Sequence, residues 1–260
     1  MTYTSILVEA VGDVAVIRFN DQKTLNAATP PMVEELLDAL SQAAASKRAV
    51  MMTGIGRAFC SGANLGTLEL SDSDEFDGGV LLESHFNPLM LAIRDLPLPI
   101  ITAVNGPAVG VGSTIALAGD LILAADRAYF MQAFRHVGVI PDAGTAYLLT
   151  RAIGRPRAME LMMLGEKLTA QKALEWGLIN RVLPPDELDS AALALATELA
   201  AGPTRALAEI RKSCWHALDT DFAGQLAADR VGQRLMGLTA DHREGVTAFF
   251  EKHRPVFVGK

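Results

Sequence analysis

The chain has 260 residues with a formal net charge of −7; 50% of its residues are hydrophobic and 20% are charged. This suits one large domain, or one domain with an appendage, around a sizeable core, and the acidic balance argues against nucleic-acid binding. The first residues, MTYTSILVEAVGD, lack the basic start and long apolar run of a signal peptide. Cys60 and Cys214 are the only cysteines and do not suggest a disulfide framework. We therefore expect a soluble, reduced, cytoplasmic protein.

Hydrophobic periodicity predicts a β/α body that runs to about residue 184. Short apolar runs between glycine and proline turns indicate buried strands, and apolar residues at helical spacing indicate helices. Thr29 followed by Pro30 marks a helix start, and Pro88 must kink or restart the helical pattern around it. In chain order we predict strands at 6–8 and 14–19, a helix from 29, a strand at 49–53, a helical pattern at 80–95, a strand at 100–104, a helix at 113–118, a strand pair at 121–124 and 128–131, helices at 145–153, 156–164 and 169–176, and a strand at 180–183.

Alanine-rich amphipathic helices fill the chain after residue 184. A helical tail without strands suggests packing against a neighbouring copy of the chain. The expected organisation is therefore a β/α core over residues 1–184 with a helical appendage over 185–260. Leu96 to Gly119 carries no charge and is long enough to mimic a membrane span, but its prolines and glycines favour a buried strand–turn–helix. We predict the tail helices at 186–201, 203–217, 221–238 and 241–252.

Two glycine-rich turns each follow a predicted buried strand. The first lies within Gly54 to Gly66, and the second is Gly110-Val111-Gly112. Neither completes the G-x-G-x-x-G fingerprint of a dinucleotide site, and the sequence has no P-loop, HExxH, GxSxG or paired CxxC motif. From composition alone, two tight turns are the simpler explanation. The functional alternative is that one backbone N–H from each turn converges on a single oxygen, as in an oxyanion hole.

Asp142 lies in an apolar neighbourhood after a proline. The residues alone leave two interpretations equal: a cap for the helix that starts near Thr145, or a general acid/base whose pKa the apolar surroundings raise. His136 is better explained as a surface or supporting residue than as a catalytic one. Cys60 is better explained as a small buried residue than as a nucleophile, because no base is adjacent. The acidic stretch Leu70 to Gly79 predicts a surface loop or lid.

Three passages occur in order along the chain: Gly56 to Leu65 (GRAFCSGANL), Pro99 to Asp120, and Gly138 to Asp142 (GVIPD). Together they resemble the crotonase, or enoyl-CoA hydratase/isomerase, family, and the similarity runs nearly end to end. Phe86 to Leu89 and the closing PVFVGK are most similar to the ring-1,2-epoxyphenylacetyl-CoA isomerase branch of that family. The resemblance implies a spiral of ββα units and a C-terminal helical region that builds trimers, often paired into hexamers.

The resemblance also implies which residues meet a coenzyme A thioester. The backbone N–H groups of Ala63 and Val111 would form the oxyanion hole, with the thioester oxygen between them. The thioester is the substrate, and neither a metal nor another cofactor is implied. The implied coenzyme A contacts are Leu25, Asn26, Ala27, Ala63, Leu65, Phe249 and Lys252, of which the last two would reach a neighbouring subunit's ligand.

Departures from the family pattern bear on the reaction. Hydratases of the family carry two glutamates, which align with Thr114 and Phe134, and neither side chain can position water and move its proton. Asp142 instead aligns with the catalytic carboxylate of the family's double-bond isomerases. We therefore expect an acyl-CoA isomerase with Asp142 as acid/base and an enolate held in the oxyanion hole. An enoyl-CoA hydratase, another crotonase-family reaction, and a non-catalytic acyl-CoA-binding protein are the alternatives. Neither a nucleic acid nor a membrane is expected as a partner.

Overall fold

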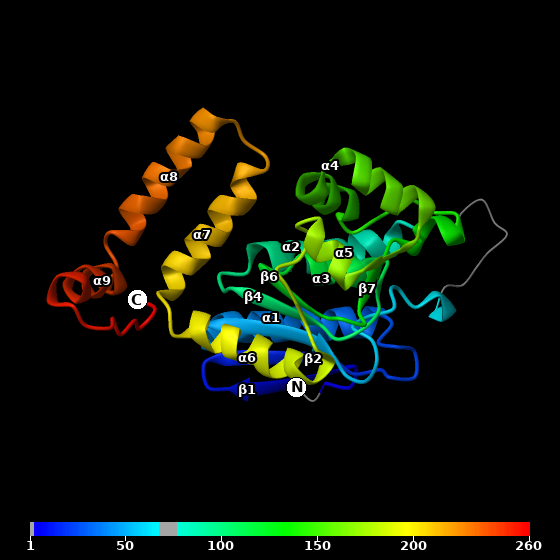
Figure 1. The fold of residues 1–260 in the computed structure, drawn as a ribbon, viewed down its shortest axis with the longest axis horizontal. Helices are drawn as coiled ribbons and strands as arrows, with labels where there is room; N and C mark the ends of the chain where they lie inside the picture. Colours follow the sequence, from blue (N-terminus) through cyan, green and yellow to red (C-terminus); the bar gives the residue numbers. More distant parts are fainter. Residues whose placement is uncertain (1–2, 68–76) are drawn as a thin grey trace.

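A computed structural model describes residues 3–67 and 77–260 (Figure 1). Most of the predicted lid, residues 70–76, therefore lies outside the described residues. The main sheet has six strands, of which β1 and β2 form an antiparallel hairpin around Gly12 and the others pair in parallel. In spatial order they are β1 (Ile6–Val11), β2 (Val14–Phe19), β3 (Ala49–Gly54), β4 (Ile100–Val104), β6 (Leu121–Ala125) and β9 (Arg181–Leu183).

A second, three-stranded sheet lies beside the first. It contains β5 (Ala108–Val109), β7 (Tyr129–Met131) and β8 (Lys167–Thr169), in that order. The sequence-based pairing of 121–124 with 128–131 is therefore wrong, because β6 pairs with β4 and β9 whereas β7 pairs with β5 and β8. A tight turn in which the Ala128 N–H donates to the Ala125 carbonyl at 2.9 Å sends the chain from one sheet to the other.

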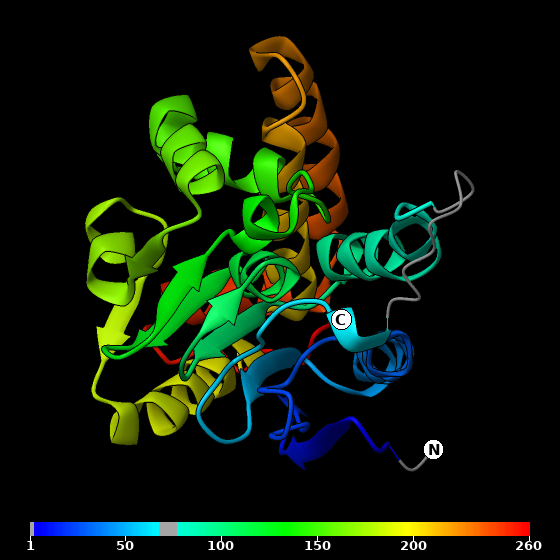
Figure 2. The ribbon, with the colours of Figure 1, turned by 90° about the vertical axis from the view of Figure 1, so that its right-hand side faces the viewer.

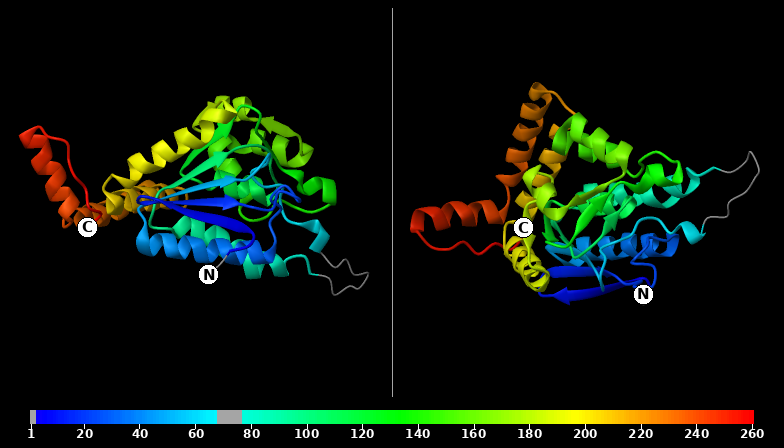
Figure 3. Two further views of the ribbon diagram at one scale, coloured as in Figure 1. Left: turned by 90° about the horizontal axis from the view of Figure 1, so that it is seen from below. Right: turned by 45° about the vertical axis from the view of Figure 1, so that its right-hand side comes forward.

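Helices cover both faces of the main sheet, which explains why β3 and β4 are mostly apolar and wholly buried. In the left panel of Figure 3 the sheet lies between α1 (Pro30–Ser46) and α6 (Pro185–Ala200). The predicted start of α1 is confirmed, since the Thr29 hydroxyl accepts a hydrogen bond from the Met32 N–H. Pro88 also acts as predicted. A π-helical segment, η2 (Leu82–Phe86), ends there, and α2 (Asn87–Asp95) restarts with Pro88 in its first turn.

The next helices carry the candidate site. Helix α3 (Val111–Leu117) starts two residues earlier than predicted, directly after Gly110, and all its residues are buried. The predicted helices at 145–153 and 156–164 are confirmed: they share the label α4 (Thr145–Leu164), but the non-helical backbone of Gly154 divides them. Helix α5 (Ala170–Glu175) has the predicted Thr169 cap. Short 3₁₀ turns complete the region at η1 (Leu65–Thr67) and η3 (Ala133–Val137).

The C-terminal helices divide into one that joins the core and three that project from it. Helix α6 buries Leu188, Ala192, Ala196 and Ala200, which recur at helical spacing and belong to the core. This helix follows the predicted boundary at residue 184 and is still a core element. Figures 1 and 3 show α7 (Thr204–Ala217), α8 (Phe222–Met236) and α9 (Ala240–Glu251) extending away from the sheet. Exposed apolar residues of the projecting part include Ile210, Leu218, Phe222, Leu226, Val231, Leu235, Leu238, Val246, Phe249, Phe250, Val256 and Val258.

Residues 96–119, the uncharged stretch, fold as β4, a turn, β5 and α3. This confirms the predicted strand–turn–helix. No helix within residues 3–67 and 77–260 is long and apolar enough to cross a membrane.

Candidate active site

The two glycine-rich turns meet at one edge of the main sheet. β3 and β4 pair in parallel with Thr53 opposite Ala103, so the segments that follow them leave the sheet side by side. A Cβ placed on Gly62 would lie 3.0 Å from the Val109 carbonyl oxygen and 4.0 Å from the Gly110 Cα. Figure 2 faces the side of the molecule on which these segments lie. The structure thus brings together two turns that are 48 residues apart in the chain.

A glycine is required where the second turn enters α3. A Cβ on Gly112 would lie 2.4 Å from the Cys60 carbonyl oxygen and 2.7 Å from the Cys60 sulfur, a contact that backbone and a buried side chain cannot relieve. The Val109 N–H donates to the same Cys60 carbonyl at 2.9 Å, which fastens the two turns to each other. The glycines therefore serve the close approach of two backbones.

The residues after these turns present free backbone donors. Within the part of the chain that the structure describes, neither the Ala63 N–H nor the Val111 N–H donates a hydrogen bond to another residue. Val111 is the first residue of α3, where the helix supplies no acceptor, and it is buried, whereas Ala63 is exposed. Two unpaired N–H groups on adjoining turns are able to donate to one shared oxygen, as an oxyanion hole requires.

The Asp142 carboxyl group does not cap α4. The cap position belongs to Gly144, with a φ of 84°, and no side chain bonds to the first turn. The Asp142 backbone carbonyl instead accepts hydrogen bonds from the Thr145 N–H at 2.9 Å and the Thr145 hydroxyl at 2.7 Å. Of the two interpretations that the sequence left equal, the capping one is wrong, because Gly144 occupies the cap position in a left-handed conformation.

Asp142 holds a carboxylate in a partly buried position with one oxygen unsatisfied. Its Oδ1 atom is the only carboxylate oxygen among the buried side-chain atoms of the described residues that lack a hydrogen-bond partner. Burial raises the pKa of Asp142 to about 6, against a smaller lowering by its own backbone N–H. A carboxylate with this pKa is ionised at neutral pH yet basic enough to take a proton.

Thr114 and Phe134 lie around the second turn. Thr114 is buried in α3, and its hydroxyl lies 3.3 Å from the Gly110 carbonyl oxygen and 2.5 Å from the Thr145 hydroxyl. Phe134 is 7% exposed in η3, and its ring edge would lie 3.9 Å from a Cβ on Gly110. The surroundings of this turn are thus a hydroxyl and an aromatic ring, neither of which is ionisable in the range of a general acid/base.

The remaining side chains singled out from the sequence have structural roles. Cys60 is fully buried, and burial raises its pKa to about 11, which keeps the thiol protonated. His136 donates from Nε2 to the Gly165 carbonyl at 3.0 Å, and Arg135 donates to the Met163 carbonyl at 2.6 Å. Both side chains therefore satisfy carbonyls at the end of α4. The interpretation of Cys60 as a small buried residue is confirmed.

The predicted coenzyme A loop, residues 25–27, is bound to the first glycine turn. The Ser61 N–H donates to the Leu25 carbonyl at 3.1 Å. The buried Asn26 side chain donates to the Ile55 and Ala58 carbonyls at 3.1 and 2.9 Å. Leu25 and Asn26 both adopt a left-handed φ of 60°, which Asn tolerates better than Leu. The side chains of Asn26 and Ala27 are buried, so a ligand at this loop would contact mainly its backbone.

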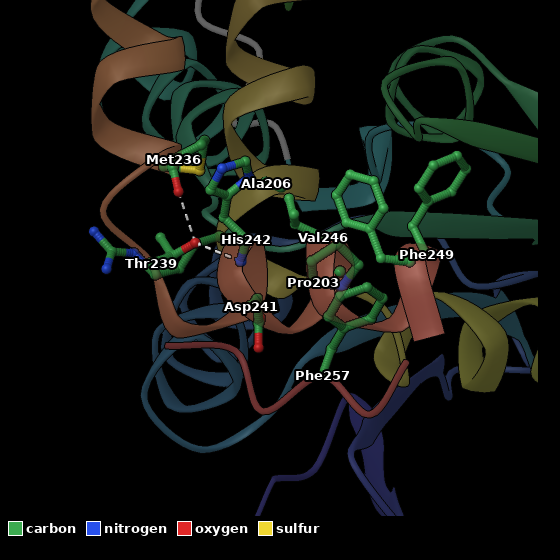
Figure 4. Close-up of a pocket in the computed structure, with 12 residues that line it drawn as sticks. Pro203, Ala206, Met236, Thr239, Asp241, His242, Val246, Phe249 and Phe257 are labelled. Atoms are coloured by element: carbon green, nitrogen blue, oxygen red, sulfur yellow. Dashed lines mark hydrogen bonds between the residues drawn. The ribbon is translucent and has the colours of Figure 1, made fainter. Parts of the chain in front are cut away.

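Leu65 and Phe249 lie at opposite ends of the chain's fold. Leu65 is 53% exposed in η1, next to the first glycine turn. Phe249 and Lys252 lie on α9 and at its end, on the far side of the molecule from η1 (Figures 1 and 3). Phe249 there lines an open cavity of about 510 Å³, together with Pro203, Val246 and Phe257 (Figure 4). One chain therefore does not bring Phe249 or Lys252 to its own glycine turns.

Thr145 is the site residue that the sequence did not reveal. The only local signal was a threonine three residues after an aspartate, which is common at helix starts. Its partner Thr114 is 31 residues away, on another helix. A metal site is not indicated, since the described residues contain no group of three or more His, Cys, Asp or Glu side chains placed to hold an ion.

Comparison with known proteins identifies the family of the chain. The sequence profile of the enoyl-CoA hydratase/isomerase family matches residues 9–260. The chain is 40% identical over 250 residues to a 1,2-epoxyphenylacetyl-CoA isomerase of Escherichia coli, with 95% of each chain covered. It is 39% identical over 260 residues to a probable enoyl-CoA hydratase of Rhodobacter capsulatus, with 100% of each chain covered.

Solved structures give the same result for the fold. An enoyl-CoA hydratase subunit I from Geobacillus kaustophilus superposes with a TM-score of 0.91 at 32% identity, covering 99% of each chain. The expected crotonase-type spiral with a C-terminal helical region is therefore confirmed. With two glycine turns at one sheet edge and a profile match over nearly its whole length, the chain belongs to the enoyl-CoA hydratase/isomerase family.

Proposed function

We propose that this protein is an acyl-CoA isomerase that moves a double bond along the acyl chain of a CoA thioester. The observation that carries the proposal is the environment of the Asp142 carboxylate. This group does not cap a helix, one of its oxygens is buried without a hydrogen-bond partner, and burial raises its pKa to about 6. An isomerisation needs one group that removes a proton and returns it elsewhere, and one such carboxylate suffices.

On a 3-enoyl-CoA, the reaction moves one proton from the α-carbon to the γ-carbon. The Asp142 carboxylate removes a proton from the α-carbon, and the electron pair delocalises onto the thioester oxygen as a dienolate. The N–H groups of Ala63 and Val111 stabilise this oxygen, because the charge on it is greatest after proton removal. Protonated Asp142 then returns the proton to the γ-carbon, which gives a 2-enoyl-CoA and restores the carboxylate.

Hydration is disfavoured at the same site. Addition of water to a 2-enoyl-CoA requires groups that orient the water, take its proton and supply another. Thr114 and Phe134 occupy the two positions that align with the glutamates of hydratases, and Phe134 packs against the Gly110 turn. The chain's likeness to a relative named as a probable hydratase keeps hydration as the second candidate.

The coenzyme A moiety is proposed to bind along the backbone of residues 25–27, Ala63 and Leu65, which border the first glycine turn. Phe249 and Lys252 would complete the site of a neighbouring copy, since they lie far from the turns of their own chain. The exposed apolar surface of α7, α8 and α9 supports a homotrimer or a dimer of trimers.

A substrate panel tests the proposal. Wild-type protein is incubated with 3-enoyl- and 2-enoyl-CoA thioesters of several chain lengths, and conjugated enoyl and 3-hydroxyacyl products are quantified. The proposal predicts double-bond migration at least about 100-fold faster than water addition. Water addition as the main reaction would establish the hydratase instead. Binding of the esters without turnover would support a non-catalytic acyl-CoA-binding protein.

A Val111→Pro variant tests the oxyanion assignment. Proline removes the N–H but fits the first position of a helix, so α3 can still form. We expect turnover to fall about 100- to 1,000-fold, while binding of a CoA ester changes by less than about threefold. Val111→Ala keeps the donor and is the matched control. Equal losses of turnover and binding in the proline variant would contradict the assignment.

A further inference from the structure

A pair of buried threonine hydroxyls joins the two halves of the candidate site. Thr114 comes from α3, which begins at the second glycine turn, and Thr145 is the first residue of α4, directly after the Asp142 loop. Their oxygen atoms are 2.5 Å apart, and both residues are at most 1% exposed. This is the side-chain hydrogen bond that connects the two segments.

The number of protons fixes the direction of the bonds. Each hydroxyl has one proton to donate. The Thr145 hydroxyl donates to the Asp142 carbonyl at 2.7 Å, so towards Thr114 it can only accept. The Thr114 proton then goes to Thr145 at 2.5 Å rather than to the Gly110 carbonyl at 3.3 Å. Thr114 is then the first donor in a series of two hydrogen bonds. Its hydroxyl orients the Thr145 hydroxyl, which in turn holds the Asp142 backbone carbonyl.

The backbone at this point is held against its own preference. Ala143 has a φ of 50°, a left-handed conformation that costs a non-glycine residue about 1 kcal/mol. Such a conformation persists only where surrounding contacts impose it. The peptide between Asp142 and Ala143 is held by the two bonds that its carbonyl accepts from Thr145. Loss of the hydroxyl bond would leave this peptide with only the Thr145 N–H bond, which loosens the peptide and, with it, the direction of the Asp142 side chain.

We propose that Thr114 and Thr145 are positioning residues, which act through the Asp142 backbone carbonyl. They fix the Asp142 carboxylate relative to the second glycine turn. The proposal rests on the proposed function, in which Asp142 is the acid/base. It assigns a use to Thr114, the position that aligns with a hydratase glutamate: the residue holds the isomerase carboxylate in place. Acid/base catalysis depends on such placement, because a displacement of about 1 Å can lower the rate about 100-fold.

Thr150 shows what a threonine without this role does. It lies on the same helix, and its hydroxyl bonds to the Ala146 carbonyl one turn earlier at 2.7 Å, an ordinary local contact. Thr150→Val is therefore the matched control for Thr145→Val, because both remove one hydroxyl from α4 and keep the side-chain shape.

The kinetic experiment compares kcat and KM for five variants on the best substrate of the panel. For Thr145→Val we expect kcat to fall between about tenfold and about 100-fold with KM within about twofold, and for Thr114→Val a fall of about tenfold. Thr145→Ser and Thr114→Ser keep the hydroxyls and should stay within about threefold of wild type. The proposal is overturned if both valine variants match Thr150→Val, or if a serine variant loses as much as its valine counterpart.

A second readout does not depend on turnover. The carbon-13 NMR resonance of the Asp142 carboxyl group is assigned by its absence from the spectrum of Asp142→Asn protein. Its chemical shift is then followed as a function of pH. A loosened Asp142 gains solvent, so Thr145→Val should move its titration midpoint by at least about half a pH unit towards the ordinary value, and Thr150→Val should not. An unchanged midpoint in both valine variants overturns the positioning role. If instead Asp142→Asn retains full turnover, the proposed function fails while the titration still decides the positioning.

Discussion

Two partly buried aspartates of this fold, 22 residues apart, differ in the partners of their carboxylates. Asp120 lies where α3 leads into β6, and both its oxygens accept from the Arg211 Nε at 2.8 Å, while one also accepts from the Ile100 N–H. Asp142 lies before α4, and within residues 3–67 and 77–260 its carboxylate has neither a cationic partner nor a capping bond. Burial raises the pKa of both, but only Asp120 has an arginine that opposes the effect.

The difference separates a carboxylate that joins elements of the fold from one that joins none. The Arg211 guanidinium also donates to the carbonyls of Ile93, Arg94 and Leu96 at the end of α2, so Asp120 helps to fasten α7 to α2 and the sheet. The Asp142 carboxylate joins nothing and keeps an oxygen available. Asp142 therefore lacks the stabilisation that an ion pair would give the folded protein. Such a loss of stability is expected of a functional site.

Removal of Arg211 should produce the largest loss of stability. Arg211→Met leaves Asp120 and three carbonyls without their partner, and we expect unfolding free energy to fall by about 3 to 5 kcal/mol. Urea unfolding of wild type and variant measures the change. The double variant Arg211→Met with Asp120→Leu removes the unpaired charge and should recover part of the loss. A fall below about 1 kcal/mol would mean that the pair does not join these elements.

Asp142→Asn should instead stabilise the protein at neutral pH. The folded pKa of about 6 lies above the ordinary value, so the native state binds the proton more tightly than the unfolded chain. Stability from this group is complete below about pH 4 and is lost as the pH rises through 6. The site is partly exposed, so solvent screening reduces the effect to about 1 kcal/mol.

Thermal unfolding at pH 4 and pH 7.5 checks that prediction. Asn has no charge to bury, so the variant should melt roughly 2 to 4 °C higher than wild type at pH 7.5. At pH 4 the two proteins should melt together, provided both remain folded there. A variant that is less stable than wild type at pH 7.5 would show that the Asp142 carboxylate has a stabilising partner after all.

The smallest effect is expected at the strained turn. Ala143→Gly relieves the strain of the left-handed backbone but removes a buried methyl group. Because these two effects offset each other, the free energy of unfolding should stay within about 0.5 kcal/mol of wild type. Ala146→Gly, at an exposed position in the first turn of α4, lacks that compensation and should lose about 1 kcal/mol. Urea unfolding of both variants measures the contrast. Equal losses would indicate that Ala143 is not strained.

The sequence predicted those parts of the fold that depend on local chemistry. The Thr29 cap, the restart of the helix at Pro88 and the Thr169 cap were predictable because a hydroxyl or a proline acts within one helical turn. β5 and β8 were missed because two or three residues are too short to show an alternating pattern. The pairing of 121–124 with 128–131 was wrong because adjacency in the chain does not decide which sheet a strand joins.

The candidate site was predictable as residues but not as an arrangement. The two glycine turns and Asp142 could be named from the chain and its family resemblance, whereas their roles in binding and catalysis stay predictions. Whether Asp142 capped α4 could not be decided, since the answer depends on the left-handed Gly144 and the Thr145 bonds. The contact between Thr114 and Thr145 joins two helices and leaves no trace in either segment alone.

The central claim is that Asp142 is the acid/base of an isomerase, and the turnover of Asp142→Asn protein tests it most directly. The measurement compares kcat of wild type and variant on the best 3-enoyl-CoA substrate, with CoA-ester affinity and thermal stability determined in parallel. We predict a fall in kcat of about 10² to 10⁴, affinity within about twofold, and stability at least equal to wild type. Turnover by the variant at the wild-type rate would contradict the claim.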